Sequence, residues 1–288
     1  MRCRFVTSWL NLLRIEMAAR RYTEAAMSIE RIESWDDPRL APYRNLKDKE
    51  LERLGERFIA EGPNVVIRLL KSGISVESVL VAERKISAIA GFASDATLIL
   101  VGSDELIERV IGFEFHSGVL ACGVRPLSPS LEAIVPKRPQ SALIVACQEI
   151  TNPENMGSLV RTAAALGADA MLLGERCCDP FFRQSVRVSM GSVFSLPMTR
   201  SENLLNDLDR LKELDVERWA MVLAEDAEQL RQVQRPARAA VLFGNEAQGL
   251  DATTVSKCDR RVTIPMRRGT DSLNVNVAAA VVLYELMR

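Results

Sequence analysis

Histidine is almost missing from this sequence, which holds one, His116, among 288 residues. This scarcity excludes a zinc site of the HExxH type and any histidine-rich metal cluster. A catalytic triad that uses histidine would have to be built around His116 alone. Aromatic residues make up only 5% of the chain, so a hydrophobic core has to be mainly aliphatic.

The six cysteines include no CxxC pair. Several of them stand in apolar runs such as VLAC and LIVAC, which is typical of buried, reduced thiols. We therefore expect a reducing, cytoplasmic location and no disulfide framework.

Long apolar runs are also absent, since no stretch reaches the roughly 18 to 20 residues that a membrane helix needs. The Arg-bearing segment 1–27 makes a poor signal peptide because Asn11 and Arg14 interrupt its apolar stretch. We interpret it as a dispensable extension ahead of a start at Met27, with an organelle transit peptide as the alternative.

Excess charge of either sign is lacking as well: 37 Lys and Arg residues balance 38 Asp and Glu residues, for a net charge of −1. This balance excludes a cationic coat over the whole surface and leaves room for a local basic patch.

No strand is followed by GxGxxG, which disfavours a standard dinucleotide or Rossmann methyltransferase site. The absence of GxxxxGK[ST] and GxSxG speaks against a P-loop and an α/β-hydrolase.

The length suits two domains better than one. We expect an extension and lead-in over residues 1–45, a small α/β domain over 46–125 and a second domain over 141–288. Residues 126–140 hold four of the twelve prolines and are predicted to be a linker between these domains.

In the first half, DPRLAPYRNL is expected to be extended because prolines discourage a helix. The spacing of Leu46, Leu51, Leu54, Phe58 and Ile59 predicts a helix that stops at Gly62. The following elements are predicted to be, in order, the helix VVIRLLKSG, the strands ESVLVAE and TLILVG, the helix DELIERVIGF and the strand GVLACGV.

The second half alternates strands and helices more regularly. ALIVACQEI is apolar enough for a strand buried on both faces. It is followed by predicted helix 158–167, strand AMLLG, helix 180–190, strand SVFSLPM, helix 202–214, strands WAMVLAE and AAVLFG, helix 251–257, strand RRVTIP and a closing helix from Ser272. This alternation predicts an α/β fold with a mostly parallel sheet covered by helices on both faces, and ligands bind such sheets beyond the carboxyl ends of their strands.

The loop ITNPENMGSLVRTAAALGAD has an unusual composition for such a position. Asn155 lies in a polar turn, and Gly157 would let the backbone approach a ligand closely. Ser158 is a candidate cap for the helix, and Arg161 follows about one turn later. The alternative is an ordinary helix start with one solvated arginine.

A second loop, VLFGNEAQGLD, places Gly244, Asn245, Glu246 and Gly249 before a helix that Asp251 would cap. Its exposed backbone groups and single carboxylate suit a neutral heterocycle or a cationic ligand better than a pyrophosphate. A plain turn is the alternative.

The third loop lies in VTIPMRRGTDSLNVNVAAAVVLYEL, where Ser272 is expected to open the last helix. The body of this helix is almost wholly apolar, so we expect it to pack against a partner surface or a second copy of the chain. Asn274 and Asn276 stand in its apolar first turn, where their amides need partners. Simple capping by Ser272 is the alternative.

Taken in order, these loops resemble the three signature motifs of the SpoU (TrmH-type) RNA 2′-O-ribose methyltransferases, in the SPOUT superfamily. The matching positions are Asn155, Gly157 and Arg161, then Gly244, Glu246 and Gly249, then Ile264-Pro265-Met266 and Ser272-Leu273-Asn274-Val275. ERFIAEGPNVVIRLLKSG…ESVLV also looks like the family's small N-terminal RNA-binding domain, which is similar to ribosomal-protein-type RNA binders. The resemblance spans residues 46–288.

The resemblance implies a deep trefoil knot in the second domain, a homodimer formed through that domain, and an S-adenosyl-L-methionine (AdoMet) cofactor. It implies transfer of a methyl group to the 2′-hydroxyl of a ribose in tRNA or rRNA, without a metal, DNA or a membrane as partner. The residues that it assigns to the cofactor are Gly244, Asn245, Glu246, Ile264, Met266 and Leu273.

By the same resemblance, Arg161 activates or orients the hydroxyl, and phosphate steering is the safer role because arginine is a poor base. Asn155, Ser272 and Asn274 would position the ribose or Arg161, and Glu246 would fix the arginine or the loop. RNA contacts are expected at a group of arginines that comprises Arg183, Arg187, Arg267 and Arg268, with Arg260 and Arg261 beside them.

The sequence departs from the family pattern at two places. Arg268 stands where the family usually has glycine, with Gly269 one position later, and Asn276 replaces a serine. The alternative is an RNA-binding or ribosome-associated protein of the same fold without transfer activity. The intact set of Asn155, Arg161, Glu246, Ser272 and Asn274 argues against it. A third reading is an α/β enzyme that acts on a small molecule without RNA. His116 is expected to be structural, since methyl transfer by alignment needs no histidine.

Overall fold

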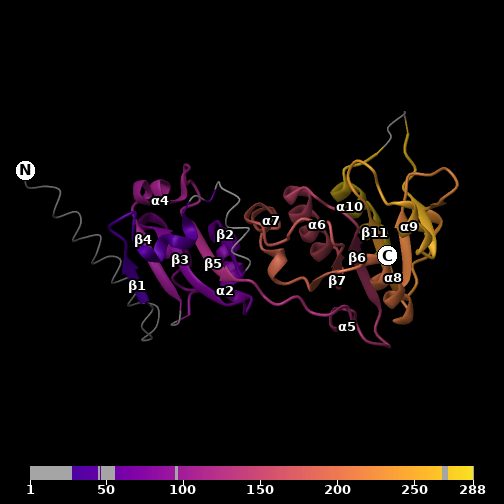
Figure 1. The fold of residues 1–288 in the computed structure, drawn as a ribbon, viewed down its shortest axis with the longest axis horizontal. Coiled ribbons are helices and arrows are strands. Elements are labelled where there is room, and N and C mark those ends of the chain that lie inside the picture. Colours follow the sequence, from indigo (N-terminus) through magenta and orange to yellow (C-terminus); the bar gives the residue numbers. More distant parts are fainter. Residues whose placement is uncertain (1–27, 45, 47–55, 95–96, 268–271, 288) are drawn as a thin grey trace, which may run out of the picture. The chain divides into compact units, whose positions relative to one another are not determined.

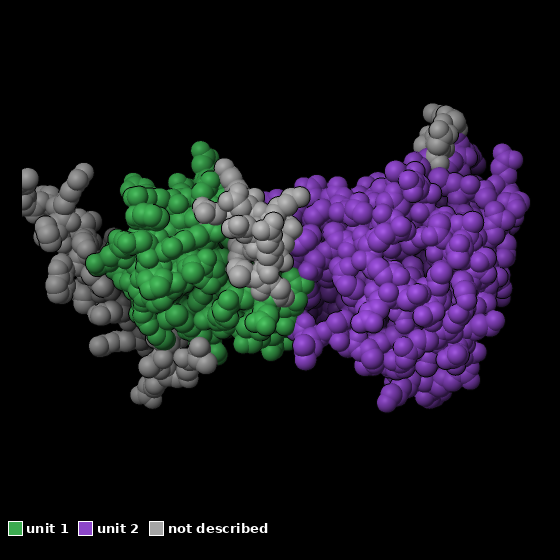
Figure 2. Space-filling view, viewed as in Figure 1, with its two compact units in different colours: residues 1–125 green, residues 126–288 purple. Residues whose placement is uncertain are grey.

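The computed structural model describes residues 28–44, 46, 56–94, 97–267 and 272–287. The chain divides into two compact units, residues 1–125 and residues 126–288 (Figures 1 and 2). No helix of the described residues is long and apolar enough to cross a membrane. The cysteines within these ranges, Cys122, Cys147, Cys177, Cys178 and Cys258, are all free thiols.

The first unit is built on a five-stranded sheet with the order β1-β4-β3-β5-β2. Strands β1 (Ser28–Arg31), β4 (Leu98–Gly102) and β3 (Val76–Ala82) run parallel, and β5 (Val119–Val124) is antiparallel to both β3 and β2 (Arg57–Glu61). The helices are α2 (Pro63–Lys71), α3 (Ile86–Ile89) and α4 (Asp104–Ile111), with short 3₁₀ helices η1 (Pro38–Tyr43) and η3 (Glu83–Lys85). The predicted strands and helices from residue 63 onward are thus present.

The segment before residue 62 differs from the prediction. Residues 57–61 form a strand, β2, instead of the end of a helix, and Ile59 pairs with Cys122 of β5. Because Phe58, Ile59 and Ala60 are all buried, pairing in the sheet outweighs their near-helical spacing. The predicted helix positions Leu51 and Leu54 lie outside the described residues.

The expected lead-in also belongs to the first unit. Strand β1 pairs with β4, and η1 buries Leu40 and Tyr43 in the core. The Tyr43 hydroxyl donates to the Ser78 carbonyl at 2.9 Å and accepts from the Cys122 amide at 3.2 Å. The prediction that DPRLAPYRNL is extended is therefore wrong, since Pro38–Tyr43 form a 3₁₀ helix. Pro38 is compatible with the first turn of that helix because its missing N–H would have no partner there.

The second unit holds a seven-stranded sheet in the order β10-β12-β9-β11-β6-β7-β8, and all of its pairings are parallel. The strands are β6 (Ala142–Cys147), β7 (Ala170–Leu173), β8 (Met198–Arg200), β9 (Glu217–Met221), β10 (Glu228–Gln229), β11 (Arg238–Phe243) and β12 (Arg260–Thr263). Every residue of β6 and β11 is buried, as expected for strands covered on both faces. The predicted α/β fold with a mostly parallel sheet is confirmed.

Helices cover this sheet (Figure 1). They are α5 (Leu131–Ile134), α6 (Pro153–Ala165), α7 (Arg183–Val188), α8 (Leu204–Glu213), α9 (Ala252–Ser256) and α10 (Val275–Leu286), with 3₁₀ helices η4 (Ser192–Phe194) and η5 (Leu230–Gln232). Helices α5 and α8 share one apolar cluster with β6, β7 and β11. Helix α6 packs against both α7 and α10. The expected linker therefore includes α5, whose buried Leu131 and Ile134 belong to this core.

Several predicted boundaries are wrong. Helix α6 begins five residues before Ser158, and its N-cap is Asn152, whose side chain accepts from the Glu154 amide at 2.8 Å. Helix α10 begins at Val275 with Asn274, not Ser272, as its N-cap. The predicted strand SVFSLPM begins instead with the 3₁₀ helix η4, and the strand β8 starts only at its last residue, Met198.

Candidate active site

The three loops singled out in the sequence follow β6, β11 and β12. Since these strands are parallel members of one sheet, their carboxyl ends lie at the same edge. The site is therefore assembled from segments about 100 residues apart in the chain, which β6 and β11 bring together as direct neighbours.

The loop of residues 244–251 after β11 closes on itself. The Asn245 amide donates to the Gly249 carbonyl at 3.0 Å, and the Gly249 amide donates back to the Asn245 carbonyl at 2.8 Å. A side chain on Gly244 would place its Cβ 2.1 Å from the Gly249 carbonyl carbon, so only glycine fits there. Gly249 itself has a φ of +72°, which also favours glycine.

Two contacts fasten this loop to the end of β6. Gln148 and Asp251 form a reciprocal pair: the Gln148 side-chain amide donates to the Asp251 carboxylate, and the Asp251 backbone amide donates to Gln148 Oε1 at 3.0 Å. Asp251 is also the N-cap of α9, as predicted, and accepts from the Thr254 amide at 2.7 Å. This backbone hydrogen bond lowers the pKa of the Asp251 carboxyl.

One asparagine connects all three loops. Asn155 Nδ2, in the first turn of α6, donates to Glu246 Oε1 at 3.0 Å. Its Oδ1 accepts from Asn276 Nδ2 at 3.0 Å and from Asn274 Nδ2 at 3.2 Å, both at the start of α10. We call Asn155, Glu246, Asn274 and Asn276 the amide cluster. Both ends of the Asn155 amide are used, so its orientation is fixed.

A cavity of about 730 Å³ opens beside the amide cluster. Apolar side chains such as Leu223, Ile264, Met266 and Leu273 contribute to its wall, and Glu246 is the one carboxylate among its described lining residues. Arg261 also lines the cavity, but it forms an ion pair with Asp226 at 2.7 Å, whereas Glu246 has no cationic partner among the described residues. Such a wall suits a ligand that combines an apolar ring with a positive charge. All six residues that the sequence assigned to a cofactor line this cavity: Gly244, Asn245, Glu246, Ile264, Met266 and Leu273.

The predicted catalytic residues are only partly brought together. Asn155, Glu246 and Asn274 contact one another in the amide cluster, and Ser272 lines the cavity without a hydrogen bond to any described residue. Arg161 lies exposed on α6, is not among the lining residues, and makes no hydrogen bond or ion pair within the described ranges.

Gly157 has a different role from the one expected. A Cβ at this position would lie 2.5 Å from the Ser185 carbonyl oxygen and 2.9 Å from the Val188 Cβ. The missing side chain therefore permits the close packing of α6 against α7, the helix that contains both Ser185 and Val188.

The arginines expected to contact RNA differ in whether a carboxylate already pairs with them. Arg260 pairs with Glu217 at 2.6 Å and Glu228 at 3.0 Å, and Arg261 pairs with Asp226 at 2.7 Å, so carboxylates already balance both charges. Arg187 donates to Gln184 at 2.9 Å. Arg267 is exposed, Arg183 stands at the start of α7, and Arg268 and Gly269 lie outside the described residues.

The sequence analysis missed four residues of the site. Val222, Leu223 and Phe243 line the cavity at the ends of β9 and β11, and Gln148 holds the 244–251 loop. The exposed fraction of Leu223 is 62%, which is high for a large apolar residue at a strand end. Leu223 was predicted to lie inside a strand. Gln148 could have been noticed in the sequence, because it is the polar residue that directly follows the apolar run of β6.

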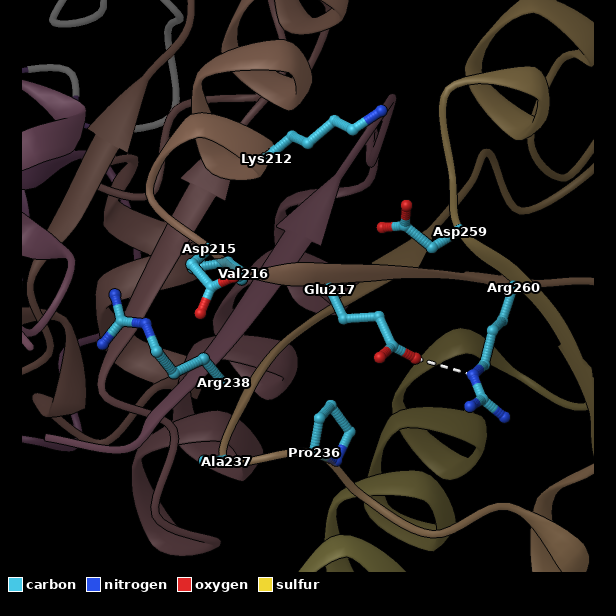
Figure 3. Close-up of a pocket in the computed structure, with 9 residues that line it drawn as sticks. All are labelled: Lys212, Asp215, Val216, Glu217, Pro236, Ala237, Arg238, Asp259 and Arg260. Atoms are coloured by element: carbon cyan, nitrogen blue, oxygen red, sulfur yellow. Dashed lines mark hydrogen bonds and ion pairs between the residues drawn. The ribbon is translucent and has the colours of Figure 1, made fainter. Parts of the chain in front are cut away.

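A second cavity of about 460 Å³ lies at the opposite, amino-terminal ends of β9, β11 and β12 (Figure 3). It contains none of the predicted catalytic or cofactor residues. Each carboxylate that lines it has an arginine partner: Glu217 pairs with Arg260, Asp259 pairs with Arg218, and Asp215 pairs with Arg138. We therefore place the candidate site at the cavity beside the amide cluster.

Comparison with known proteins identifies relatives of this chain. The sequence profile of the SpoU rRNA Methylase family matches residues 142–284, which lie within the second unit. An uncharacterized tRNA/rRNA methyltransferase of Mycobacterium tuberculosis is 37% identical over 262 residues, covering 88% of this chain and 90% of that protein. The 23S rRNA (guanosine(2553)-2′-O)-methyltransferase RlmP of Bacillus subtilis is 28% identical over 263 residues, covering 90% of this chain and 99% of RlmP.

Among solved structures, the AdoMet-bound rRNA methyltransferase from Sinorhizobium meliloti superposes on this chain with a TM-score of 0.77 at 27% identity. The match covers 90% of this chain and 97% of that one, so both units have counterparts in the same order.

Proposed function

This chain belongs to the SpoU rRNA Methylase family, and from that premise we propose how it works as an AdoMet-dependent methyltransferase acting on the 2′-hydroxyl of a ribose in RNA. The observation that carries the proposal is the amide cluster. Asn155 joins the loops after β6, β11 and β12 beside a cavity lined by every residue expected to bind the cofactor.

The residues at this cavity fit AdoMet. Backbone groups of the 244–251 loop and the side chains of Ile264, Met266 and Leu273 would hold the cofactor. Gly244 has no room for a side chain because the backbone of Gly249 and Leu250 lies against it, so glycine at this position lets the loop close into the shape that lines the cavity. When bound, AdoMet supplies an electrophilic methyl group on a positively charged sulfur. The Glu246 carboxylate at the cavity favours that charge.

Catalysis then asks the chain mainly for alignment. The amide cluster would fix the loops that position the ribose, because Asn155 is hydrogen-bonded from two sides. The Ser272 hydroxyl lines the cavity without a hydrogen bond to any residue that the structure describes, and it would contact the ribose. Arg161 has no carboxylate partner among the described residues, so its guanidinium is available to hold an RNA phosphate and orient the 2′-hydroxyl.

Three finer features follow from the family resemblance. We assign RNA contact to Arg183, Arg187, Arg267 and Arg268 and to the first unit as a ribosomal-protein-like RNA-binding domain. We assign a trefoil knot to the C-terminal segment, a proposal supported by the contacts of Asn274 and Asn276 with the first loop and by the packing of α10 against α6. The free thiols at the described cysteines support the reducing cytoplasm as the location.

A homodimer is proposed from one face of α10. The side chains of Val277, Val281, Tyr284 and Met287 follow one another at spacings of three or four residues and are between 41% and 61% exposed. An apolar stripe of this kind on a helix is typical of a surface that packs against a partner. A second copy of the chain would cover it.

The test is methyl transfer from labelled AdoMet to deproteinised tRNA and rRNA, followed by mapping of ribose methylation. We expect label in ribose 2′-O positions of one RNA class. We also expect Arg161→Ala to abolish transfer while AdoMet still binds in calorimetry, and Arg231→Ala, another exposed arginine, to leave transfer unchanged. Absence of label in every RNA would leave an RNA-binding protein without transfer activity.

A further inference from the structure

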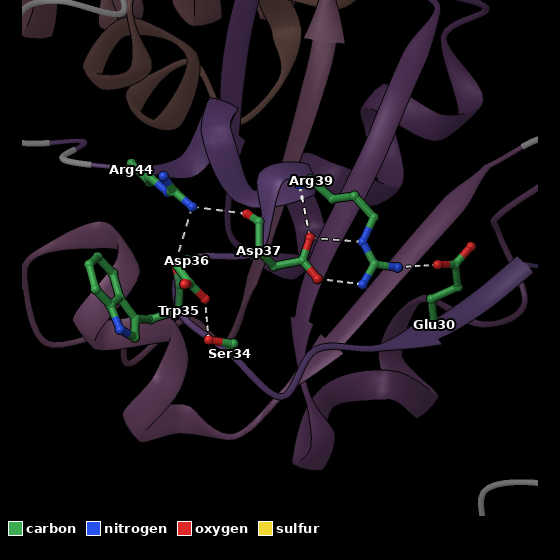
Figure 4. Close-up of polar contacts among 7 residues, drawn as sticks. All are labelled: Glu30, Ser34, Trp35, Asp36, Asp37, Arg39 and Arg44. Carbon is green, nitrogen blue, oxygen red and sulfur yellow. Dashed lines mark hydrogen bonds and ion pairs between the residues drawn. The ribbon is translucent and has the colours of Figure 1, made fainter.

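The first unit presents a tryptophan, Trp35, on the loop between β1 and η1 (Figure 4). The exposed fraction of Trp35 is 46%, although tryptophan is on average among the more buried residues. An indole that stays in contact with water at this level offers a large, flat apolar surface to a partner.

Several polar contacts fix the loop that carries this side chain. Asp37 accepts from both the backbone amide and the Nε of Arg39, each at 2.9 Å, and these hydrogen bonds lower the pKa of Asp37 to about 2. Arg44 Nη2 donates to the Asp37 carbonyl at 3.0 Å and to the Trp35 carbonyl at 3.4 Å. The backbone beside Trp35 is therefore held in place from the far end of η1.

An arginine side chain lies against the indole. Arg109 of α4 lies over the ring, with its guanidinium carbon 4.6 Å from the ring centre. Neither Arg109 nor Arg44 forms an ion pair with a carboxylate of the described residues, whereas Arg39 forms ion pairs with both Asp37 and Glu30. The same loop carries two carboxylates without an arginine partner among the described residues, Glu33 and Asp36, and Asp36 accepts from the Ser34 hydroxyl. These two carboxylates balance Arg44 and Arg109, and Arg109 is the cation that lies against the indole.

We propose that Trp35 and Arg109 form a stacking platform for an unpaired base of the RNA substrate, an inference that rests on the proposed function. Aromatic side chains bind unpaired bases by stacking, and neighbouring arginines meet the phosphates that accompany each base. Because the loop is already fixed, little conformational freedom is lost when a base docks. An exposed indole with an arginine on its ring offers both a stacking surface and a cation, which matches the alternating base and phosphate chemistry of RNA more closely than an apolar protein surface.

The same unit contains a matched control. Phe92 is 41% exposed and has Lys71 Nζ over its ring at 4.4 Å. It precedes β4 at the amino-terminal edge of the sheet, whereas Trp35 follows the carboxyl end of β1, the parallel neighbour of β4. The two aromatic residues therefore lie at opposite edges of the sheet.

The experiment measures binding of fluorescein-labelled RNA hairpins with an unpaired loop, and of the matched fully paired duplex, by anisotropy at one fixed salt concentration. Trp35→Ala is expected to weaken hairpin binding about tenfold, within the range for loss of one stacked base, and to change duplex binding much less. Trp35→Phe is expected to retain most of the affinity, and Phe92→Ala all of it. AdoMet affinity, measured by calorimetry, stays unchanged in each variant.

Three results would overturn the platform. The first is hairpin binding by Trp35→Ala that equals the wild type, which would assign this surface to a protein partner. The second is an equal loss in Phe92→Ala, and the third is failure of the wild-type protein to bind the hairpin. Thermal unfolding of each variant and the binding of Trp35→Phe separate loss of the platform from loss of the fold. Failure of the proposed function is a distinct result, because it appears as absent methyl transfer by the wild type.

Discussion

The side-chain amide of Asn155 donates to the carboxylate of Glu246 at 3.0 Å and joins the first turn of α6 to a loop 91 positions later in the chain. The oxygen of the same amide accepts from two amides at the start of α10. One side chain thus sets the relative position of three loops at the cavity. Its replacement would release all three at once.

We therefore expect Asn155→Ala to lower kcat/KM for RNA by roughly 100-fold, the cost of a misplacement of reacting groups by about an ångström. The cofactor cavity is lined by other residues, so AdoMet affinity should change much less. Radiolabel transfer and calorimetry measure the two effects. Asn203→Ala is the control: it removes an N-cap on α8, costs about 1 kcal/mol of stability and should leave kcat/KM unchanged. Equal activities of the two variants would contradict the role of Asn155.

The second prediction concerns Gly244. In Gly244→Ala the new methyl would collide with the Gly249 carbonyl carbon at 2.1 Å, so the loop has to open and AdoMet affinity should fall at least about tenfold. Gly91→Ala is a matched control, since a Cβ at Gly91 meets no atom within 4 Å. Calorimetric titration with AdoMet compares the two. Unchanged affinity in Gly244→Ala would place the cofactor away from this loop.

The third prediction concerns the exposed face of α10. Val281→Asp places a charge in the middle of the apolar stripe, so the proposed homodimer should dissociate to monomers, with its dissociation constant raised roughly 100-fold or more. Light scattering after size-exclusion chromatography reports the mass. Leu127→Asp, at a residue that is 95% exposed outside this stripe, should leave the mass as it is in the wild type. A monomeric wild-type protein would refute the dimer.

A fourth prediction follows from Asp251. Its pKa is lower in the folded state than the usual value near 4, so its contribution to stability is complete above that value and is lost as the pH falls through the folded pKa. The free energy of unfolding of the wild type should exceed that of Asp251→Ala by about 1 kcal/mol at neutral pH.

This difference should shrink below about pH 4, as urea unfolding followed by circular dichroism would measure. Asp251→Asn provides the control, because an asparagine can still cap α9 but cannot titrate. Its stability relative to Asp251→Ala should therefore not vary with pH. A constant difference between wild type and Asp251→Ala down to pH 3 would contradict the assignment.

The sequence predicted the parallel sheet and the place of the site because both depend on local patterns. Apolar runs such as that of β6 end abruptly in polar or glycine residues, and Asp251 stands directly before a helix, which marks an N-cap. The cofactor residues were assigned through the family resemblance, and all of them line one cavity.

The errors arose where local signals compete or distant contacts decide. NPENMGS contains two candidate caps, and Pro153 at the first helical position selects Asn152 over Ser158. Strand β2 carries helical spacing but is buried against β5. The partners of Asn155 at positions 274 and 276 lie 119 and 121 residues away, and no pattern near Asn155 reveals them.

The reciprocal hydrogen bonds between Asn245 and Gly249 join backbone groups of one and the same loop. The turn is therefore defined by its backbone, in the segment that lines the cofactor cavity. Selection at this loop should consequently act on backbone shape more than on side-chain identity. Ala247 and Gln248, whose amides are already held by the Asn245 side chain at 2.9 and 3.2 Å, are the positions where the sequence can drift without changing the turn.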